Sequence, residues 1–361
     1  MSSMSFIEEK SKCLPYLSRP KLYFGLILAF FIKSIGAAWD VSYHFKHFRE
    51  FYQLPHIVNA LGDVILLFLL FYLWFRGTQK IQRELRIILY GILIFIGGII
   101  FDQWYHEKFG VDLTIWSPAH FVLYAGSLIS LIGSFLYVLR DWPESRMSLS
   151  MKKISGILFS VLILDVFWFM LLQHEQGVVM DYALKQGIRL ADADLIEIFF
   201  RTQKDVYSNL PLWLYGAWAI FSAVLVFQFV KRMNLHKYGA TLVASIYLTE
   251  RFILNTVFDS INYPTSALPF YLIIIAFIFD VLYNKLAKKS LVRDIATSVV
   301  PIVVIILLGF IKTDPPFHPP IVVFQTFLAA IPAAILGYIF IQLYFHLFFI
   351  SSYQNPATGP E

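Results

Sequence analysis

The chain alternates between long apolar stretches and short polar segments from residue 22 to residue 341. Ten apolar stretches are each about 20 residues long, which is enough for a helix to cross the roughly 30 Å hydrocarbon core of a bilayer. The pattern therefore predicts an all-α, polytopic transmembrane helical bundle of about ten spans, at residues 22–39, 57–75, 85–101, 119–139, 154–173, 211–230, 239–257, 266–283, 295–311 and 320–341.

Composition agrees with this class, because hydrophobic residues make up 58% of the chain and charged residues only 15%. We expect a single integral membrane domain over residues 1–361, with the lipid bilayer as its partner. The longest polar segment, 174–210, is expected on the extracytoplasmic side, with an amphipathic helix between Asp192 and Lys204 at the membrane surface. The tail at 351–361 contains Pro, Gly and Asn and is expected to be disordered.

Basic residues are divided unevenly between the two sets of loops. Alternate loops, starting with the N-terminal tail, hold 19 Lys and Arg, whereas the loops between them hold 8. The positive-inside rule then places both termini in the cytoplasm of a multi-pass plasma-membrane protein. Because the basic residues are scattered over short loops, the net charge of +5 predicts no nucleic-acid partner. Cys13 is the single cysteine, which excludes an internal disulfide and a thiolate metal site.

Two segments look like copies of one helical hairpin, at residues 22–75 and 85–139. Each has Asp-x3-His at the end of one expected span and a Pro-flanked His at the start of the next, with a Gly six residues later. The offset between the copies is 62 residues before the connecting loop and 64 after it. The shared positions are Asp40, Tyr43, His44, His56 and Gly62 in the first copy and Asp102, Tyr105, His106, His120 and Gly126 in the second.

The spacing of these residues suits a metal site. An Asp and a His four residues apart lie on one face of a helix, and the first turn of the next helix can supply a third ligand. Pro is favoured at such a helix start, and the Gly lets a neighbouring helix approach closely. An Asp-His-His set leaves coordination positions open, as a reactive metal requires. We therefore expect an extracytoplasmic metal region with six ligands: Asp40, His44, His56, Asp102, His106 and His120.

The second copy resembles a segment of a known protein family. Asp102-Gln-Trp-Tyr-His106, then Asp112, then Ser117-Pro-Ala-His120 and Tyr124, is similar to the metal-binding segment in a membrane subunit of the membrane-bound copper methane and ammonia monooxygenases. The likeness covers about 25 of 361 residues, with Val111 where the family has Arg and one extra residue between the two His. It implies copper at Asp102, His106 and His120, partner membrane subunits, and monooxygenase activity on a small substrate such as ammonia or a hydrocarbon.

The residues alone leave several alternatives open. Iron and zinc accept the same ligand types as copper, and the two sets form either one dinuclear centre or two separate sites. A non-catalytic subunit that carries metal or stabilises a larger complex is one rival function. A second rival, less favoured, holds haem between histidine pairs for electron transfer. Asp314 and His318 repeat the Asp-x3-His spacing and would extend the array of hairpins.

Further polar residues are candidates for orienting the ligands or relaying protons: Tyr43, Asp63, Tyr105, Asp112 and Tyr124. Asp63 follows His56 by two helical turns, so it could also bind metal or pair with Lys33. Asp165, Glu250 and Arg251 fall inside expected spans, where ionisable side chains are costly unless they have a function or a partner. For Glu250 and Arg251 we favour a structural explanation, in which these acids and bases neutralise each other between helices.

Overall fold

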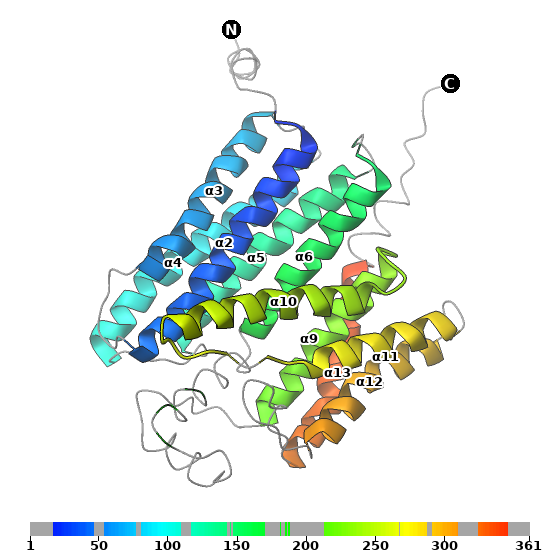
Figure 1. The fold of residues 1–361 in the computed structure, drawn as a ribbon. Coiled ribbons are helices and arrows are strands. Elements are labelled where there is room, and N and C mark those ends of the chain that lie inside the picture. Colours follow the sequence, from blue (N-terminus) through cyan, green and yellow to red (C-terminus); the bar gives the residue numbers. More distant parts are fainter. Residues whose placement is uncertain are drawn as a thin grey trace, which may run out of the picture. The chain divides into compact units, whose positions relative to one another are not determined.

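The computed structural model describes residues 17–46, 54–76, 81–109, 117–142, 145, 147–169, 181, 185, 187, 213–266, 268–286, 291–309 and 324–345. These residues are all-α and form ten helices (Figure 1): α2 (Arg19–Lys46), α3 (Leu54–Arg76), α4 (Gln82–Phe109), α5 (Pro118–Asp141), α6 (Leu149–Phe169), α9 (Trp213–Arg232), α10 (Gly239–Ser260), α11 (Tyr271–Lys285), α12 (Leu291–Gly309) and α13 (Phe324–Phe345). The predictions for residues 192–204, the tail at 351–361, Asp112, Asp314 and His318 lie outside the described residues.

Four helices among the described residues are long and apolar enough to cross a membrane, which supports a multi-pass membrane protein. They are α2, α3, α4 and α5. The expectation of about ten spans is therefore corrected to these four for the described part of the chain. Two helices show why: α11 has 15 residues, fewer than the roughly 20 that a span needs, and α10 carries Glu250 and Arg251 near its centre.

The chain divides into two compact units. Unit 1 comprises Met1–Asn209 and Tyr247–Leu268, and unit 2 comprises Leu210–Ile246 and Pro269–Glu361. In unit 1, α2 packs against α3 and α4 packs against α5, so the four membrane helices form two hairpins. Helices α2 and α4 run in the same direction and end at the same side of this unit (Figure 1). The prediction of a single membrane domain stays a prediction.

Within each hairpin, the two helices pack closely at the predicted glycine. A Cβ atom on Gly62 would lie 2.6 Å from the carbonyl oxygen of Ala29, and one on Gly126 would lie 2.8 Å from that of Gly91. No side chain fits such spaces without moving backbone, so the prediction that these glycines allow close helix approach is confirmed. Ala29 and Gly91 are themselves 62 residues apart, the offset of the sequence repeat.

A second pair of contacts has the same register. Gly36 of α2 lies against Asn59 of α3, and Gly98 of α4 lies against Leu123 of α5. The two glycines differ by 62 positions and their partners by 64, as the repeat requires. The helices of both hairpins therefore meet at equivalent residues. This common register sets the ends of α2 and α3 against each other in the same way as the ends of α4 and α5.

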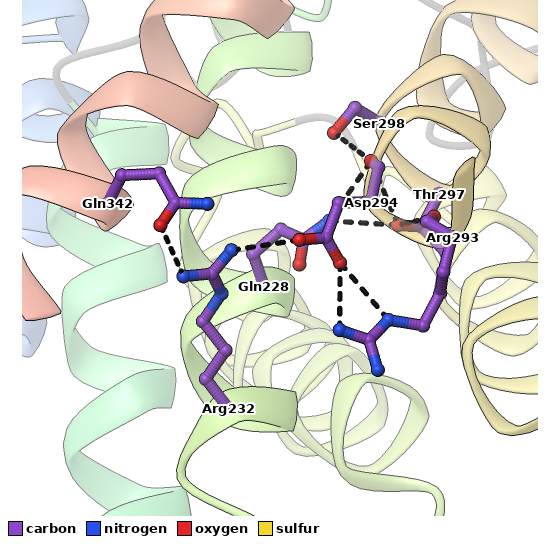
Figure 2. Close-up of polar contacts among 7 residues, drawn as sticks. All are labelled: Gln228, Arg232, Arg293, Asp294, Thr297, Ser298 and Gln342. Atoms are coloured by element: carbon purple, nitrogen blue, oxygen red, sulfur yellow. Dashed lines mark hydrogen bonds and ion pairs between the residues drawn. The ribbon is translucent and has the colours of Figure 1, made fainter. Parts of the chain in front are cut away.

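In unit 2, a polar cluster joins α9, α12 and α13 (Figure 2). Arg232 donates to Gln342 at 3.0 Å and to Asp294 at 3.1 Å. Gln228 donates to the hydroxyl of Thr297 at 2.8 Å. Each of these buried or half-buried groups thus has a partner from another helix, which offsets the cost of removing it from water.

Candidate metal centre

The second hairpin positions three candidate ligands by local helix chemistry. Asp102 and His106 lie in the last two turns of α4, one turn apart on the same face. Ser117 caps α5 by accepting a hydrogen bond from the backbone N–H of His120 at 3.1 Å, and Pro118 occupies the first turn. The predicted helix start at Pro118 is confirmed. His120 therefore sits at the beginning of α5, opposite the end of α4.

These three side chains come together. Oδ1 of Asp102 lies 3.2 Å from Nε2 of His120 and 3.6 Å from Nε2 of His106. One ligand atom from each of the three residues lies within 4.8 Å of the other two, so the group could hold a metal ion. Ligand atoms about 2.1 Å from a tetrahedral ion are separated by about 3.4 Å, close to the distances of 3.2 Å and 3.6 Å from Asp102 to the two imidazoles.

The surroundings of this group favour a bound cation. The side chain of His106 is 12% exposed, and those of Asp102 and His120 are each 18% exposed. Oδ1 of Asp102 is itself buried from solvent. A nearby positive charge, either a protonated imidazole or a metal ion, stabilises a carboxylate that is mostly removed from water. The rings of His106 and His120 stand nearly perpendicular, at 86°, with centroids 5.6 Å apart.

The first hairpin brings together two of its three predicted ligands. Nε2 of His56 lies 2.8 Å from Oδ1 of Asp40, a hydrogen-bonding distance. This pair is more open to solvent, because the side chain of Asp40 is 26% exposed and that of His56 is 39% exposed. His44 lies on α2, but its side chain is outside the described part of the structure. Among the described residues, the group whose ligand atoms all lie within 4.8 Å of one another contains Asp102, His106 and His120, and Asp40 and His56 are not part of it. The choice between one dinuclear centre and two separate sites stays a prediction.

The predicted supporting residues have different surroundings. Asp63 is buried and forms an ion pair with Lys33, which is the pairing alternative expected for it. Tyr43 stacks on Tyr263 at 5.8 Å, one residue before His44. Tyr105 packs against Phe109, with ring centroids 4.8 Å apart. The structure places Tyr124 one turn after His120 on α5, half-buried. Roles for these residues in orienting ligands or relaying protons stay predictions.

The sequence analysis did not identify the partners of several buried charges. Ser34 lies within hydrogen-bonding distance of both Asp165 and Glu250, and Arg251 forms an ion pair with Asp165. The ring of Phe95 lies under the ammonium group of Lys33, 3.4 Å from its centroid. One feature of the sequence could have indicated a buried polar contact on α2: the polar dipeptide Lys33-Ser34 interrupts the apolar stretch at 22–39.

The geometry therefore defines one Asp-His-His group, at Asp102, His106 and His120, and one Asp-His pair, at Asp40 and His56. Both lie at the ends of hairpins whose helices are long and apolar enough to span a membrane. No protein-family model, curated protein or solved structure matches the chain.

Proposed function

We propose that this protein is an integral membrane metalloprotein that binds a transition-metal ion through Asp102, His106 and His120. The observation that carries the proposal is the convergence of three ligand atoms from two helices to within 4.8 Å. Two of these ligands are fixed by helix spacing and the third by the capped start of the next helix. The fold itself therefore brings the ligands together, so little free energy of metal binding is spent on ordering them.

The ligand set narrows the class of metal. Two imidazoles and one carboxylate suit copper, iron or zinc, whereas magnesium and calcium prefer all-oxygen sites. The resemblance of residues 102–124 to the metal-binding segment of the copper monooxygenases supports copper as the first choice. A copper or iron ion held by three protein ligands would supply oxygen activation for a monooxygenase-like reaction on a small or apolar substrate. Partner membrane subunits are part of this proposal.

Each of the three ligands has its own role in the proposed metal binding. Asp102 would lower the net charge of a bound cation, and its carboxylate oxygen lies within 3.6 Å of both imidazoles. His106 and His120 supply the nitrogen ligands. The charge bias of the loops supports placing these residues on the extracytoplasmic side with both termini in the cytoplasm. The same site in a metal-carrying subunit would bind the ion without substrate turnover.

Metal analysis of the purified protein tests the proposal. The detergent-solubilised chain is stripped with a chelator, reloaded with Cu²⁺, Fe²⁺ or Zn²⁺ separately, and its metal content is measured by mass spectrometry. We expect one tightly held ion in the wild type, and its loss in His106→Ala and in His120→Ala. His236→Ala is the control, because His236 is exposed and belongs to a different unit. Equal metal content in all four proteins would overturn the proposal.

Oxygen consumption distinguishes the catalytic role from the carrier role. The reloaded wild type and His106→Ala are mixed with ammonia or a short hydrocarbon and a chemical reductant. Product formation that requires both the metal and His106 supports a monooxygenase. Tight metal binding without oxygen consumption, in the presence of partner membrane proteins, would replace that role with metal carriage.

A further inference from the structure

A cluster of charged and polar side chains that includes none of the candidate metal ligands is buried inside unit 1. It consists of Ser34 on α2, Asp165 on α6, and Glu250 and Arg251 on α10. All four residues are buried, with Asp165 only 1% exposed and Arg251 only 2% exposed. Water therefore contributes little to the solvation of these groups, and their charges must be balanced within the cluster.

The charges in the cluster do not cancel if every group is ionised. Arg251 forms an ion pair with Asp165, and this pair is neutral. Glu250 is the remaining acid, and its hydrogen-bonding partner is the uncharged hydroxyl of Ser34. An ionised Glu250 would leave one negative charge in excess in a buried place. Such a charge is far more costly than a neutral carboxylic acid that keeps its hydrogen bond.

The position of Ser34 gives a second, independent argument from geometry. Its hydroxyl oxygen lies 2.5 Å from Oδ2 of Asp165 and 3.1 Å from Oε1 of Glu250. A serine hydroxyl has one hydrogen to donate, so it can donate to only one of two carboxylates. Both contacts are hydrogen bonds only if one acid brings a proton of its own. Because Asp165 already faces Arg251, the acid that brings the proton is Glu250.

We propose that the Ser34, Asp165, Glu250 and Arg251 cluster is a binding site for one proton, which Glu250 holds as a neutral carboxylic acid. Glu250 donates this proton to Ser34, and Ser34 donates its own to Asp165. Release of the proton leaves one uncompensated negative charge between α2, α6 and α10. The site is distinct from the metal ligands, and the proposal does not rest on the proposed metal function.

The neighbouring charged groups do not supply the missing cation. Lys33, next to Ser34 on α2, forms its ion pair with Asp63 of α3, and its ammonium group also lies over the ring of Phe95 on α4. Tyr247, one turn before Arg251 on α10, is buried and has the Arg251 guanidinium 5.7 Å from its ring centroid. Among the residues that the structure describes, each nearby positive charge thus has an acid of its own, and Glu250 is the acid in excess.

Two variants with opposite expectations test the proton site. Glu250→Gln keeps the shape and a hydrogen-bond donor of the neutral acid, so its apparent melting temperature in detergent should match the wild type in mildly acidic buffer. Asp165→Asn removes the anion that faces Arg251 and should melt well below both. On raising the pH, the wild type should lose a few degrees relative to Glu250→Gln, because only the wild type can release the proton. A loss of stability in Glu250→Gln as large as in Asp165→Asn would overturn the proposal.

Infrared spectroscopy reports the proton directly. The wild-type minus Glu250→Gln difference spectrum should contain the C=O stretching band of a protonated carboxyl group, and the band should disappear in alkaline buffer. Asp102→Asn, a carboxyl variant at the other site, should retain the band. The absence of the band from the difference spectrum overturns the assignment. Stabilisation of the wild type, but not of Glu250→Gln, by sodium over choline at fixed pH would also overturn it, because the bound cation would then be a metal ion.

Discussion

The two membrane hairpins carry the same sequence pattern but present it differently. In the second hairpin, the Asp102 carboxylate faces two imidazoles at 3.2 Å and 3.6 Å, and the group is mostly enclosed. In the first, Asp40 lies 2.8 Å from His56, and the pair is more open to solvent. Both carboxylates therefore contact an imidazole directly, but among the described residues only the second hairpin gathers a third ligand atom within 4.8 Å of the other two. The comparison makes the second hairpin the stronger candidate for a metal site.

The hairpins also differ in their interiors. The first has the buried ion pair Lys33–Asp63, and the repeat offset places Phe95 and Ser127 at the matching positions of the second. Lys33 and Phe95, which are equivalent in the repeat, contact each other through the ammonium group and the ring. At these equivalent positions, one hairpin therefore has a charged pair and the other an uncharged one. Helix register is the same in both, so the difference lies in the side chains and not in the packing of the backbone.

The largest expected effect comes from breaking the ion pair of the first hairpin. Asp63→Ser leaves the Lys33 ammonium buried without its acid and should lower the free energy of unfolding by about 3–5 kcal/mol. The double variant Lys33→Phe with Asp63→Ser gives the first hairpin the residues of the second and should recover most of that loss. Denaturant unfolding in detergent measures both. A single variant as stable as the double would contradict a charged pair at this position.

The next effect distinguishes the two metal-ligand sets. His106→Ala should weaken metal binding by roughly 100-fold or more, because it removes one of three ligands from the enclosed group. His56→Ala should change the affinity for the first bound ion much less. Isothermal titration of the stripped protein with Zn²⁺ or Cu²⁺ compares the two variants. Equal losses would mean that both hairpins contribute to one centre.

A smaller effect tests the common register of the hairpins. Gly126→Ala and Gly62→Ala each place a Cβ atom against backbone of the facing helix and should cost about 1–3 kcal/mol of unfolding free energy. Gly97→Ala is the control, because a Cβ atom there meets nothing within 4 Å and alanine favours the helix. Thermal unfolding of the three variants in detergent gives the ranking. A loss at Gly97 equal to that at Gly126 would show that close approach is not the reason for the glycines.

The smallest effect concerns acidification. Protons compete with a metal ion for the imidazoles of His106 and His120, so metal occupancy should fall as the pH is lowered. The same protonation strengthens the attraction between Asp40 and His56, so the first hairpin should show no loss of stability in that range. Metal content and melting temperature measured over one pH series separate the two responses. Occupancy that is constant down to acidic pH would argue against imidazole ligands.

Local patterns predicted much of the fold and part of the site. Apolar stretches identified α2 to α5 as helices long and apolar enough to cross a membrane, because span length and hydrophobicity are properties of contiguous sequence. The Asp-x3-His spacing placed Asp102 and His106 on one face, and Pro118 marked the start of α5. The repeat offset anticipated the register of both hairpins. Among the described residues, two of the expected spans differ from the prediction for clear reasons: α11 is too short to cross a bilayer, and α10 carries two charges near its centre.

The sequence by itself determined which helices form and which residues share a helical face, because these depend on neighbours within about one turn. Only the tertiary structure decided how far the end of α4 lies from the start of α5, and hence that Asp102, His106 and His120 meet. It also decided that Arg251 forms its ion pair with Asp165, 86 residues away, while the adjacent Glu250 reaches Ser34. A buried charge takes the partner that packing brings within reach, and distance along the chain does not record which residue that is.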